Sequence, residues 1–361
     1  TTQPPIRCFI VNWTEMNHLL VLRFSALGDV SMTATVVRAA LEQNPDLRIT
    51  WVTRPLLAEK IPAHPRLVFW TTDFRGVQQT PWGVLSWIRQ QMRAAAADAH
   101  PVEAVADLHR NLRTRVVCAG LGWRGLPVER LVKDRIERRQ LRLKGALHVE
   151  AITPVTTRMA EVFQRLGLAL EWTEKTAQSV LPTQVAPAAG SAPKLYFAPT
   201  ARHKTKQWPL NYAQEFLAAW MERGGEAVLA GSAAEREELE RWIQPEWSQR
   251  CTVTAGMNNE DEVAVRRTCH VAVTLDSANL HLAVQSGLPV VSIWGGTHPK
   301  AGFVGLGHPN VHVLQAPDPA FPCRPCSIFG KSTCALGDVP CLHAVEVKSV
   351  LERAWEVATS A

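Results

Sequence analysis

The sequence has no run of about 20 consecutive apolar residues, the length that a helix needs to cross a bilayer. Residues 1–17 also lack the basic start and the continuous apolar stretch of a secretory signal. We therefore expect a cytoplasmic protein. Hydrophobic residues make up 46% of the chain and charged residues 20%, a balance that is ordinary for a soluble globular protein and argues against extensive disorder.

Signatures of two other kinds of partner are missing as well. The chain has no RNP, zinc-finger or helix-turn-helix pattern, so nucleic acid is not an expected partner. It has no D-x-D pair of carboxylates that would hold Mg²⁺ beside phosphates. The nearest acidic cluster, Glu260-Asp261-Glu262, begins a helical pattern, where acids favour the helix dipole. We expect no required cofactor and no metal at a reaction centre.

Positive charge, by contrast, is concentrated in one segment. The net charge is +6, and residues 110–144 contain eleven Lys and Arg against three acids. Such a segment attracts an anionic membrane surface or a phosphorylated lipid. The alternative is a solvated basic helix face. Trp123 is the only aromatic residue in the segment, which again disfavours nucleic acid.

Short β-rich runs alternate along the chain with segments of helical apolar spacing, such as 30–42 and 83–97. That alternation predicts parallel sheets with helices on both faces. Strands are expected over 18–24, 48–53, 66–70 and 103–108 in the first half, and over 194–198, 226–231, 250–254, 270–275 and 289–294 in the second. The predicted fold class is α/β, with two Rossmann-like domains whose parallel sheets face a central cleft.

A chain of 361 residues has room for two domains of ordinary size. The stretch 182–193 is rich in Pro, Ala, Gly and Ser and is predicted to be the linker. The first domain is then 1–181 and the second 194–342, and residues 343–361 are expected to form a helix that packs back toward the first domain. Residues 1–15 precede Met16 and are interpreted as an extension. A monomer is expected.

One glycine pattern points elsewhere. Gly120-x-Gly122-x-x-Gly125 matches a dinucleotide-binding fingerprint, but it follows a helical stretch and lacks an acidic residue about 20 positions further on. We therefore discount a dehydrogenase. Because ligands of open α/β sheets bind at the carboxyl ends of the strands, chemistry is expected in the strand-to-helix loops.

The first strand runs into the loop Arg23-Phe24-Ser25-Ala26-Leu27-Gly28-Asp29-Val30. Gly28 permits a tight turn, and the free N–H groups at the start of the next helix favour an anion. Asp29 is either a helix N-cap or a general base that faces an incoming hydroxyl. A second loop of this domain, 107–111, ends a strand and is expected to face the same cleft.

Two loops of the second domain gather cations, hydroxyls and histidines. The loop 199–209 contains three cations, a histidine and two threonines, which predicts a diphosphate clamp, with a solvated basic loop as the alternative. The strand at 270–275 leads into Asp276-Ser277-Ala278-Asn279-Leu280-His281 and then a helix. Ser277 and the adjacent N–H groups are expected to hold phosphate, while a simple serine cap and a core histidine are the alternatives.

Together these three segments resemble glycosyltransferase family 9, the ADP-heptose:lipopolysaccharide heptosyltransferases, over essentially the whole chain. Family members follow the first strand with R-x-S-x-x-G-D, have a loop that ends K-x-W-P, and carry D-[ST]-G-x-x-H before a G-x-P strand. Here these patterns are Arg23 to Asp29, Lys206 to Pro209, and Asp276 to His281 followed by Gly287-Leu288-Pro289.

The resemblance implies a GT-B fold and an inverting, metal-independent transfer of a sugar, a heptose from ADP-heptose, onto an anionic lipopolysaccharide core-type acceptor, with peripheral contact at the inner face of the inner membrane. It makes Asp29 the catalytic base. The implied donor-binding residues are Thr200, Lys206, Glu235, Met257, Asp276, Ser277, Ala278 and His281. The expected acceptor-binding residues are Ser25, Gly28, His109 and Arg110. Ala278 departs from the family pattern, which has glycine there.

Two rival functions are kept. Another GT-B enzyme of nucleotide sugars, such as an epimerase, would act on the donor without an acceptor. A non-enzymatic basic protein that binds anionic lipid would show no saturable nucleotide binding.

The cysteines form a separate question. Cys323-x2-Cys326-x7-Cys334-x6-Cys341 is spaced for a structural zinc site. A cytoplasmic setting disfavours disulfides, and we favour reduced packing thiols over zinc. Four further cysteines are scattered and are interpreted as small hydrophobes: Cys8, Cys118, Cys251 and Cys269.

Overall fold

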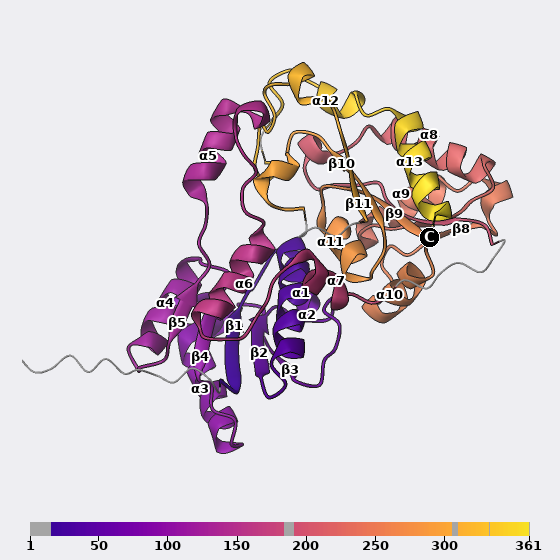
Figure 1. Cartoon of the computed structure of the whole chain (residues 1–361). Coiled ribbons are helices and arrows are strands. Elements are labelled where there is room, and N and C mark those ends of the chain that lie inside the picture. Colours follow the sequence, from indigo (N-terminus) through magenta and orange to yellow (C-terminus); the bar gives the residue numbers. More distant parts are fainter. Residues whose placement is uncertain (1–15, 184–190, 305–309, 332, 361) are drawn as a thin grey trace, which may run out of the picture.

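The computed structural model describes residues 16–183, 191–304, 310–331 and 333–360. Figure 1 shows two α/β units side by side, each with its own sheet. The first sheet contains β1 (His18–Leu22), β2 (Arg48–Thr53), β3 (Leu67–Thr71), β4 (Ala104–Asp107) and β5 (Val128–Arg130), in the order β3-β2-β1-β4-β5. Its strands are all parallel.

The second sheet is also parallel throughout. It contains β6 (Lys194–Ala198), β7 (Glu226–Leu229), β8 (Cys251–Val253), β9 (Val271–Leu275), β10 (Val290–Trp294) and β11 (Val311–Gln315), in the order β11-β10-β9-β6-β7-β8. The predicted fold class, two α/β domains with parallel sheets, is confirmed. The proposed extension 1–15, with Cys8, and most of the proposed linker lie outside the described residues.

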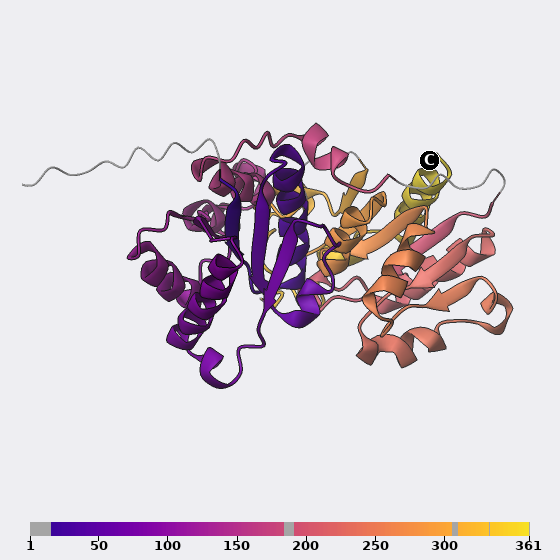
Figure 2. The same cartoon turned by 90° about the horizontal axis from the view of Figure 1, so that it is seen from below.

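Helices cover both faces of each sheet, as Figure 2 shows from below. In the first domain, α1 (Leu27–Gln43) and α6 (Val155–Arg165) pack on one face, and α3 (Pro81–Ala97) and α4 (Leu112–Gly122) on the other. In the second, α8 (Leu210–Glu222), α9 (Arg236–Arg241) and α13 (Val347–Thr359) cover one face, and α10 (Asn259–Arg267) and α11 (Ala278–Gln285) the other. None of the helices in the described parts of the chain is long and apolar enough to span a membrane.

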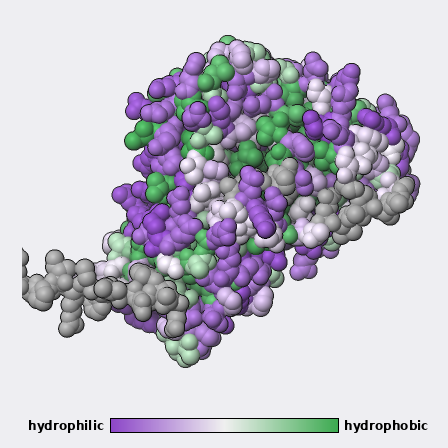
Figure 3. All heavy atoms as spheres, viewed as in Figure 1, coloured by the Kyte–Doolittle hydropathy of each residue, from purple (hydrophilic) through white to green (hydrophobic). Residues whose placement is uncertain are grey.

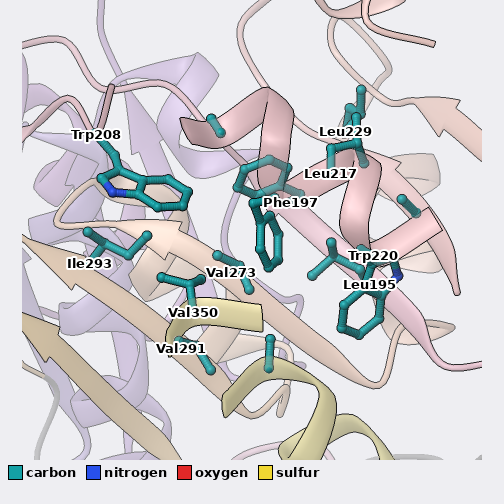
Figure 4. Close-up of a cluster of buried hydrophobic side chains, with 14 of the residues drawn as sticks. Leu195, Phe197, Trp208, Leu217, Trp220, Leu229, Val273, Val291, Ile293 and Val350 are labelled. Atoms are coloured by element: carbon teal, nitrogen blue, oxygen red, sulfur yellow. The ribbon is translucent and has the colours of Figure 1, made fainter. Parts of the chain in front are cut away.

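The core beneath α8 explains the tryptophan of the K-x-W-P pattern. Trp208 is fully buried and lies beside Phe197 and Ile293 in the side-chain cluster of Figure 4. Its indole N–H donates to the carbonyl of Val345 over 3.0 Å. Trp208 is therefore a core residue that fixes the loop immediately before α8, and so holds Lys206 in place.

Two strands and one helix differ from the sequence expectations. The edge strands β5 and β11 were not among the predicted strands, and every residue of both is only half-buried. The last helix, α13, does not return to the first domain but packs on α8, β9 and β10, with Val350, Ala354 and Ala358 in the core of the second domain. An apolar stripe on α13 matches the face of the second sheet, which lies directly beside it.

The two domains touch along α1 and α11. Ser31 of α1 donates its hydroxyl to Gln285 of α11 over 3.1 Å. On another side of the molecule, Lys60, which follows α2 (Pro55–Ala58), forms an ion pair of 2.8 Å with Glu262 of α10. We call the contact between α1 and α11, with the strand-end loops around it, the domain junction.

Candidate active site at the domain junction

Strand register brings the candidate loops together in each domain. In the first sheet, Leu22 of β1 is opposite Asp107 of β4, so the loop that contains Asp29 lies beside 107–111. In the second sheet, Ala198 of β6 is opposite Thr274 of β9, so the loop that contains Lys206 lies beside the one that begins at Asp276. In each sheet, the connections that follow these two neighbouring strands run toward opposite edges of the sheet. Open α/β sheets bind their ligands at such points.

Asp29 is held in the first turn of α1, but not as its cap. Helix α1 begins at Leu27, so Ala26 occupies the cap position and Asp29 is the third helical residue. Its Oδ2 lies 2.5 Å from Nη2 of the buried Arg23 and accepts the N–H of Ala26 over 3.3 Å. The side chain stays 30% exposed. The carboxylate is thus oriented through one oxygen and still accessible from solvent.

The loop after β4 is organised by Asp107, which is fully buried. Its Oδ1 accepts the backbone N–H groups of His109 and Arg110 over 3.1 and 2.7 Å, and its Oδ2 lies 3.0 Å from Nη2 of Arg130. Every one of these contacts shapes the loop. Asp107 is therefore a structural carboxylate, whereas Asp29 in the neighbouring loop remains accessible.

Of the expected acceptor residues, Ser25 and Gly28 belong to the same loop as Asp29 and His109 lies close to it, whereas the side chain of Arg110 is directed to Leu131. The ring of His109 packs 5.2 Å from that of Phe24, and burial and nearby Arg23 lower its pKa to about 4, against the opposing effect of Asp107 and Asp29. Ser25 is half-buried, and Arg110 is exposed with its guanidinium donating to the carbonyl of Leu131 over 2.9 Å. His109 is neutral at neutral pH, so it offers a neutral hydrogen-bonding group rather than a cation.

Lys206 is the cation held at the edge of the second sheet. Its Nζ lies 2.7 Å from Oδ2 of the buried Asp276, which also accepts the hydroxyl of Thr297 over 2.6 Å. The aliphatic part of Lys206 crosses Gly330, where a Cβ would lie 2.5 Å from the Cε atom of Lys206. The side chain of Lys206 is only 16% exposed, so Asp276 fixes the position of its ammonium group, which is not free in solvent.

The start of α11 meets the start of α1. A Cβ on Gly28 would lie 2.9 Å from Cδ2 of His281 and 3.6 Å from Cα of Ala278, so glycine allows the two helices this approach. Ser277 is the cap of α11 and accepts the N–H of Asn279 over 3.3 Å. Burial lowers the pKa of His281 to about 4, with Lys206 adding to the shift and Asp276 and Asp29 opposing it. Charges from both domains therefore act on one neutral histidine.

Three further donor candidates gather at the ends of β6, β7 and β8. Burial tends to raise the pKa of Glu235, but hydrogen bonds from Ser232 and from Thr200 outweigh it and lower that pKa. The turn before Met257 packs on the same segment, since a Cβ on Gly256 would lie 3.3 Å from that of Ala233. Met257 itself is 37% exposed. The structure thus groups Thr200, Glu235 and Met257, although their roles stay predictions.

Sequence reasoning missed several residues of the junction. Arg138 of α5 (Arg135–Lys144) lies over the rings of Phe303 and Phe329, 4.9 and 5.4 Å from their centroids, and so links the first domain to loops of the second. Arg23 is the first residue of the R-x-S-x-x-G-D pattern, but it was given no role. Its place six residues before Asp29 could have suggested the ion pair between them. Nothing local in the sequence marks Arg138 or Gly330, because their partners are far along the chain.

The four-cysteine loop packs against Lys206 through Gly330 and against Arg138 through Phe329. Cys323 is exposed, Cys326 and Cys334 are half-buried, and Cys341 is buried in α12 (Pro340–His343). Burial raises the pKa of Cys341 to about 11, and the neighbouring thiols act in the same direction. Among the residues that the structure describes, no three His, Cys, Asp or Glu side chains are grouped as metal ligands.

The state of these thiols stays a prediction. In protein purified without added metal, elemental analysis should find no stoichiometric zinc, and all four loop thiols should react in denaturant without prior chelation, because unmetallated thiols react freely once unfolded. A zinc signal of about one per chain that disappears in Cys323→Ser would show a metal site instead.

The fold explains the pattern Gly120-x-Gly122-x-x-Gly125. Gly120 and Gly122 lie inside the last turns of α4 rather than between a strand and a helix. A Cβ on Gly120 would lie 2.4 Å from Cδ2 of Leu85. The glycine lets α3 and α4 pack closely, and the pattern is not a dinucleotide site.

Two parallel-sheet domains that hold a carboxylate at the edge of one sheet and an aimed cation at the edge of the other have the architecture of a GT-B glycosyltransferase. The chain belongs to glycosyltransferase family 9 (heptosyltransferase), whose family model matches residues 117–327.

Individual relatives agree with this assignment. The chain is 28% identical over 333 residues to lipopolysaccharide heptosyltransferase 1 of Pseudomonas aeruginosa, a match that covers 88% of this chain and 87% of the relative. The structure of E. coli heptosyltransferase WaaC with ADP matches 94% of this chain and 99% of its own at 19% identity and a TM-score of 0.64. A family 9 glycosyl transferase from Veillonella parvula matches 96% and 98% at 18% identity and a TM-score of 0.66.

Proposed function

We propose that the protein is an inverting, metal-independent transferase that moves a heptose from ADP-heptose onto a lipopolysaccharide core-type acceptor, at the inner face of the inner membrane. The observation that carries the proposal is the placement of Lys206 and Asp29 in different domains around one buried histidine, His281. The relative from Pseudomonas aeruginosa is named as a lipopolysaccharide heptosyltransferase, and the E. coli enzyme was solved with ADP, which supports the donor and acceptor classes.

The donor would bind to the second domain. Lys206 and the N–H groups at the start of α11 would take the diphosphate, since charge-assisted contacts and a helix N-terminus both favour anions. Asp276 then has the role of aiming Lys206, not of touching phosphate, because two negative groups would repel. Thr200, Glu235 and Met257 would line the ribose and the base. His281 would contribute a neutral ring.

The acceptor would enter from the first domain. Its hydroxyl oxygen forms the new bond to the anomeric carbon while the bond from that carbon to the diphosphate oxygen breaks. The bonding electrons leave with ADP, and the hydroxyl proton passes to Asp29. Because attack and departure take place on opposite faces of the sugar, the configuration inverts. Lys206 and the helix N–H groups would stabilise the charge that accumulates on the leaving diphosphate.

A panel of nucleotides tests the donor class. Selective binding stabilises a fold by about 2.7 kcal/mol at a ligand concentration of 100 times Kd. We expect ADP to raise the melting temperature more than GDP, UDP or dTDP at equal concentration. Equal shifts, or none, would remove ADP-heptose as the donor. The epimerase alternative is tested by incubating the donor alone, because an epimerase would convert it and a transferase would only hydrolyse it slowly.

Gly330 offers a separate test of the aimed cation. In Gly330→Ala, the added Cβ would overlap the stem of Lys206 at 2.5 Å and must displace it. We expect ADP binding to weaken about tenfold, through loss of one charge-assisted contact. Gly337 is the matched control, because its φ of +90° is as unfavourable for alanine as the +81° of Gly330, and a Cβ added there would meet nothing within 4 Å. Equal effects of the two substitutions on ADP affinity in calorimetry would mean that backbone strain alone is responsible.

A further inference from the structure

Helix α5 exposes cations and apolar side chains together. Ile136 and Leu143 are 69% and 65% exposed. Arg135, Arg139 and Arg142 are exposed beside them, and within the described residues none of the three forms an ion pair with a carboxylate. We call these five side chains the α5 face. Isoleucine and leucine this exposed are costly to keep in water unless a partner covers them.

Helical geometry places the apolar pair on one stripe. Residues seven apart are separated by nearly two full turns, so Ile136 and Leu143 point in directions that differ by only about 20°. Arg139 lies about 60° around the helix from Ile136, and Arg135 and Arg142 lie about 100° and 120° away on the same side. Leu147, 44% exposed, follows shortly after the end of α5. The cations therefore line one side of an apolar stripe instead of forming an evenly charged surface.

The opposite side of α5 is already occupied by this protein. Leu141 is fully buried, and Arg138 lies over the rings of Phe303 and Phe329. The segment that follows is tied to the second domain, because the N–H of Ala146 donates to the carbonyl of Arg324 over 2.9 Å and Lys300 donates to the carbonyl of Ala146 over 2.7 Å. The helix cannot roll to bury Ile136 and Leu143 without breaking these contacts.

The surroundings of α5 leave the face open. In Figure 1, α5 stands at the upper left, away from the body of the first sheet. The same region in Figure 3 shows apolar side chains among hydrophilic ones. A flat or gently curved partner can therefore reach the face without meeting the rest of the chain.

We propose that the α5 face docks on the surface of a bilayer that contains anionic phospholipid, with the arginines at the headgroups and Ile136 and Leu143 inserted between them. Exposed apolar residues flanked by arginines are the composition of helices that lie in a membrane interface, and the anionic headgroups supply the complementary charge. The biological role of this docking rests on the proposed function. Arg138, on the inner side of α5, lies over the ring of Phe329, and the next residue, Gly330, packs against the stem of Lys206. A docked α5 therefore holds the proposed donor site close to a lipid-borne acceptor.

Vesicle flotation tests the docking. The wild-type protein, without nucleotide, is expected to float with vesicles of phosphatidylethanolamine and phosphatidylglycerol, and not with vesicles of phosphatidylcholine. Each cation near an anionic surface contributes about a fivefold factor, so R135Q/R139Q/R142Q should lower partitioning about 100-fold. I136S/L143S, which leaves the charge unchanged, should lower it about tenfold or more with all arginines present. The variants should bind ADP as the wild type does.

The controls lie on the second domain. L210S removes an exposed leucine of α8, and K348Q/R353Q removes two exposed cations of α13, and neither should change flotation. Full binding by I136S/L143S would overturn the proposal, since only a solvated basic face would then be at work. A change in sedimentation from dimer to monomer in that variant would assign the face to a second copy of the chain instead.

Failure of the docking and failure of the proposed function give different results. If the wild type binds ADP and modifies a detergent-dispersed acceptor but never floats with anionic vesicles, the docking is wrong and the transferase stands. If it floats, and loses flotation in both α5 variants, but binds no nucleotide, the docking stands without the transferase.

Discussion

Asp29→Asn is expected to lower kcat by about 10²- to 10⁴-fold while the affinity for ADP stays unchanged. An acceptor hydroxyl is a poor nucleophile at neutral pH, so a positioned carboxylate must take its proton as the new bond forms. Asp29 is oriented by Arg23 and by the N–H of Ala26 through a single oxygen, Oδ2, and is partly exposed. Asparagine keeps the size and one acceptor oxygen but cannot accept the proton. Transfer rates at saturating donor and acceptor measure the effect.

A matched control separates catalysis from helix stability. Asp261 is the third residue of α10, as Asp29 is of α1, and lies in the first turn beside its own cap residue Asn258. Each substitution to Asn removes one favourable interaction with a helix dipole, which costs about 1 kcal/mol or less for partly exposed groups. Asp29→Asn also removes the negative partner of the buried Arg23 and leaves only a hydrogen bond to the asparagine oxygen there, so it should melt at a lower temperature than Asp261→Asn. Both variants should still bind ADP, and only Asp29→Asn should lose activity. Nearly full activity in Asp29→Asn would exclude Asp29 as the base.

Lys206→Ala is expected to weaken ADP binding about 10- to 100-fold and to leave binding of adenosine unchanged. A charge-assisted hydrogen bond contributes about 1.5 to 3 kcal/mol, and about 1.4 kcal/mol corresponds to a tenfold change in affinity. The ammonium group is held at 2.7 Å from Asp276, at the strand edge where a diphosphate would bind. Calorimetry with both ligands separates a phosphate contact from general damage, because damage would weaken both.

Two further variants sharpen this test. Lys204, two residues earlier in the same turn, is 79% exposed and pairs with Asp338 at the surface over 3.4 Å, so Lys204→Ala should leave ADP affinity unchanged. In Lys206→Ala, Asp276 is left buried without its cation and would repel phosphate. K206A/D276N removes that repulsion, so it should regain part of the lost affinity, as double-mutant cycles show for coupled groups. Equal losses of ADP and adenosine binding would rule out the phosphate role.

The general architecture followed from local patterns. Nine of the expected strands lie where apolar runs predicted them, because buried parallel strands are nearly continuous in apolar residues. The missing strands, β5 and β11, are edge strands that are half-buried along their whole length, and edges carry a weaker pattern. β11 reads Val-His-Val-Leu-Gln, which is neither a continuous apolar run nor a strict alternation, so neither pattern marked it. The packing of α13 depends on which sheet face the other helices leave uncovered. That is decided only when the domain has assembled, so the local sequence does not show it.

The candidate site was predictable residue by residue but not in its pairings. Loops at the carboxyl ends of strands marked Asp29, Lys206, Asp276 and His281. The sequence did not show that Asp276 aims Lys206, nor that Gly28 lets α1 approach His281, because each pair joins residues distant in the chain. Nor did it show that Asp107, at the start of the loop 107–111, is fully engaged by that loop and by Arg130.

Mass spectrometry of the acceptor is the most direct test of the proposed heptose transfer. The wild-type protein would be incubated with ADP-heptose and lipopolysaccharide that lacks its core heptose, in the presence of a metal chelator, with donor alone and acceptor alone as controls. We expect that the acceptor gains the mass of one heptose, that an equal amount of ADP appears, and that NMR of the product shows a new linkage with the configuration opposite to that of the donor. An unchanged acceptor together with a chemically altered ADP-heptose would contradict it.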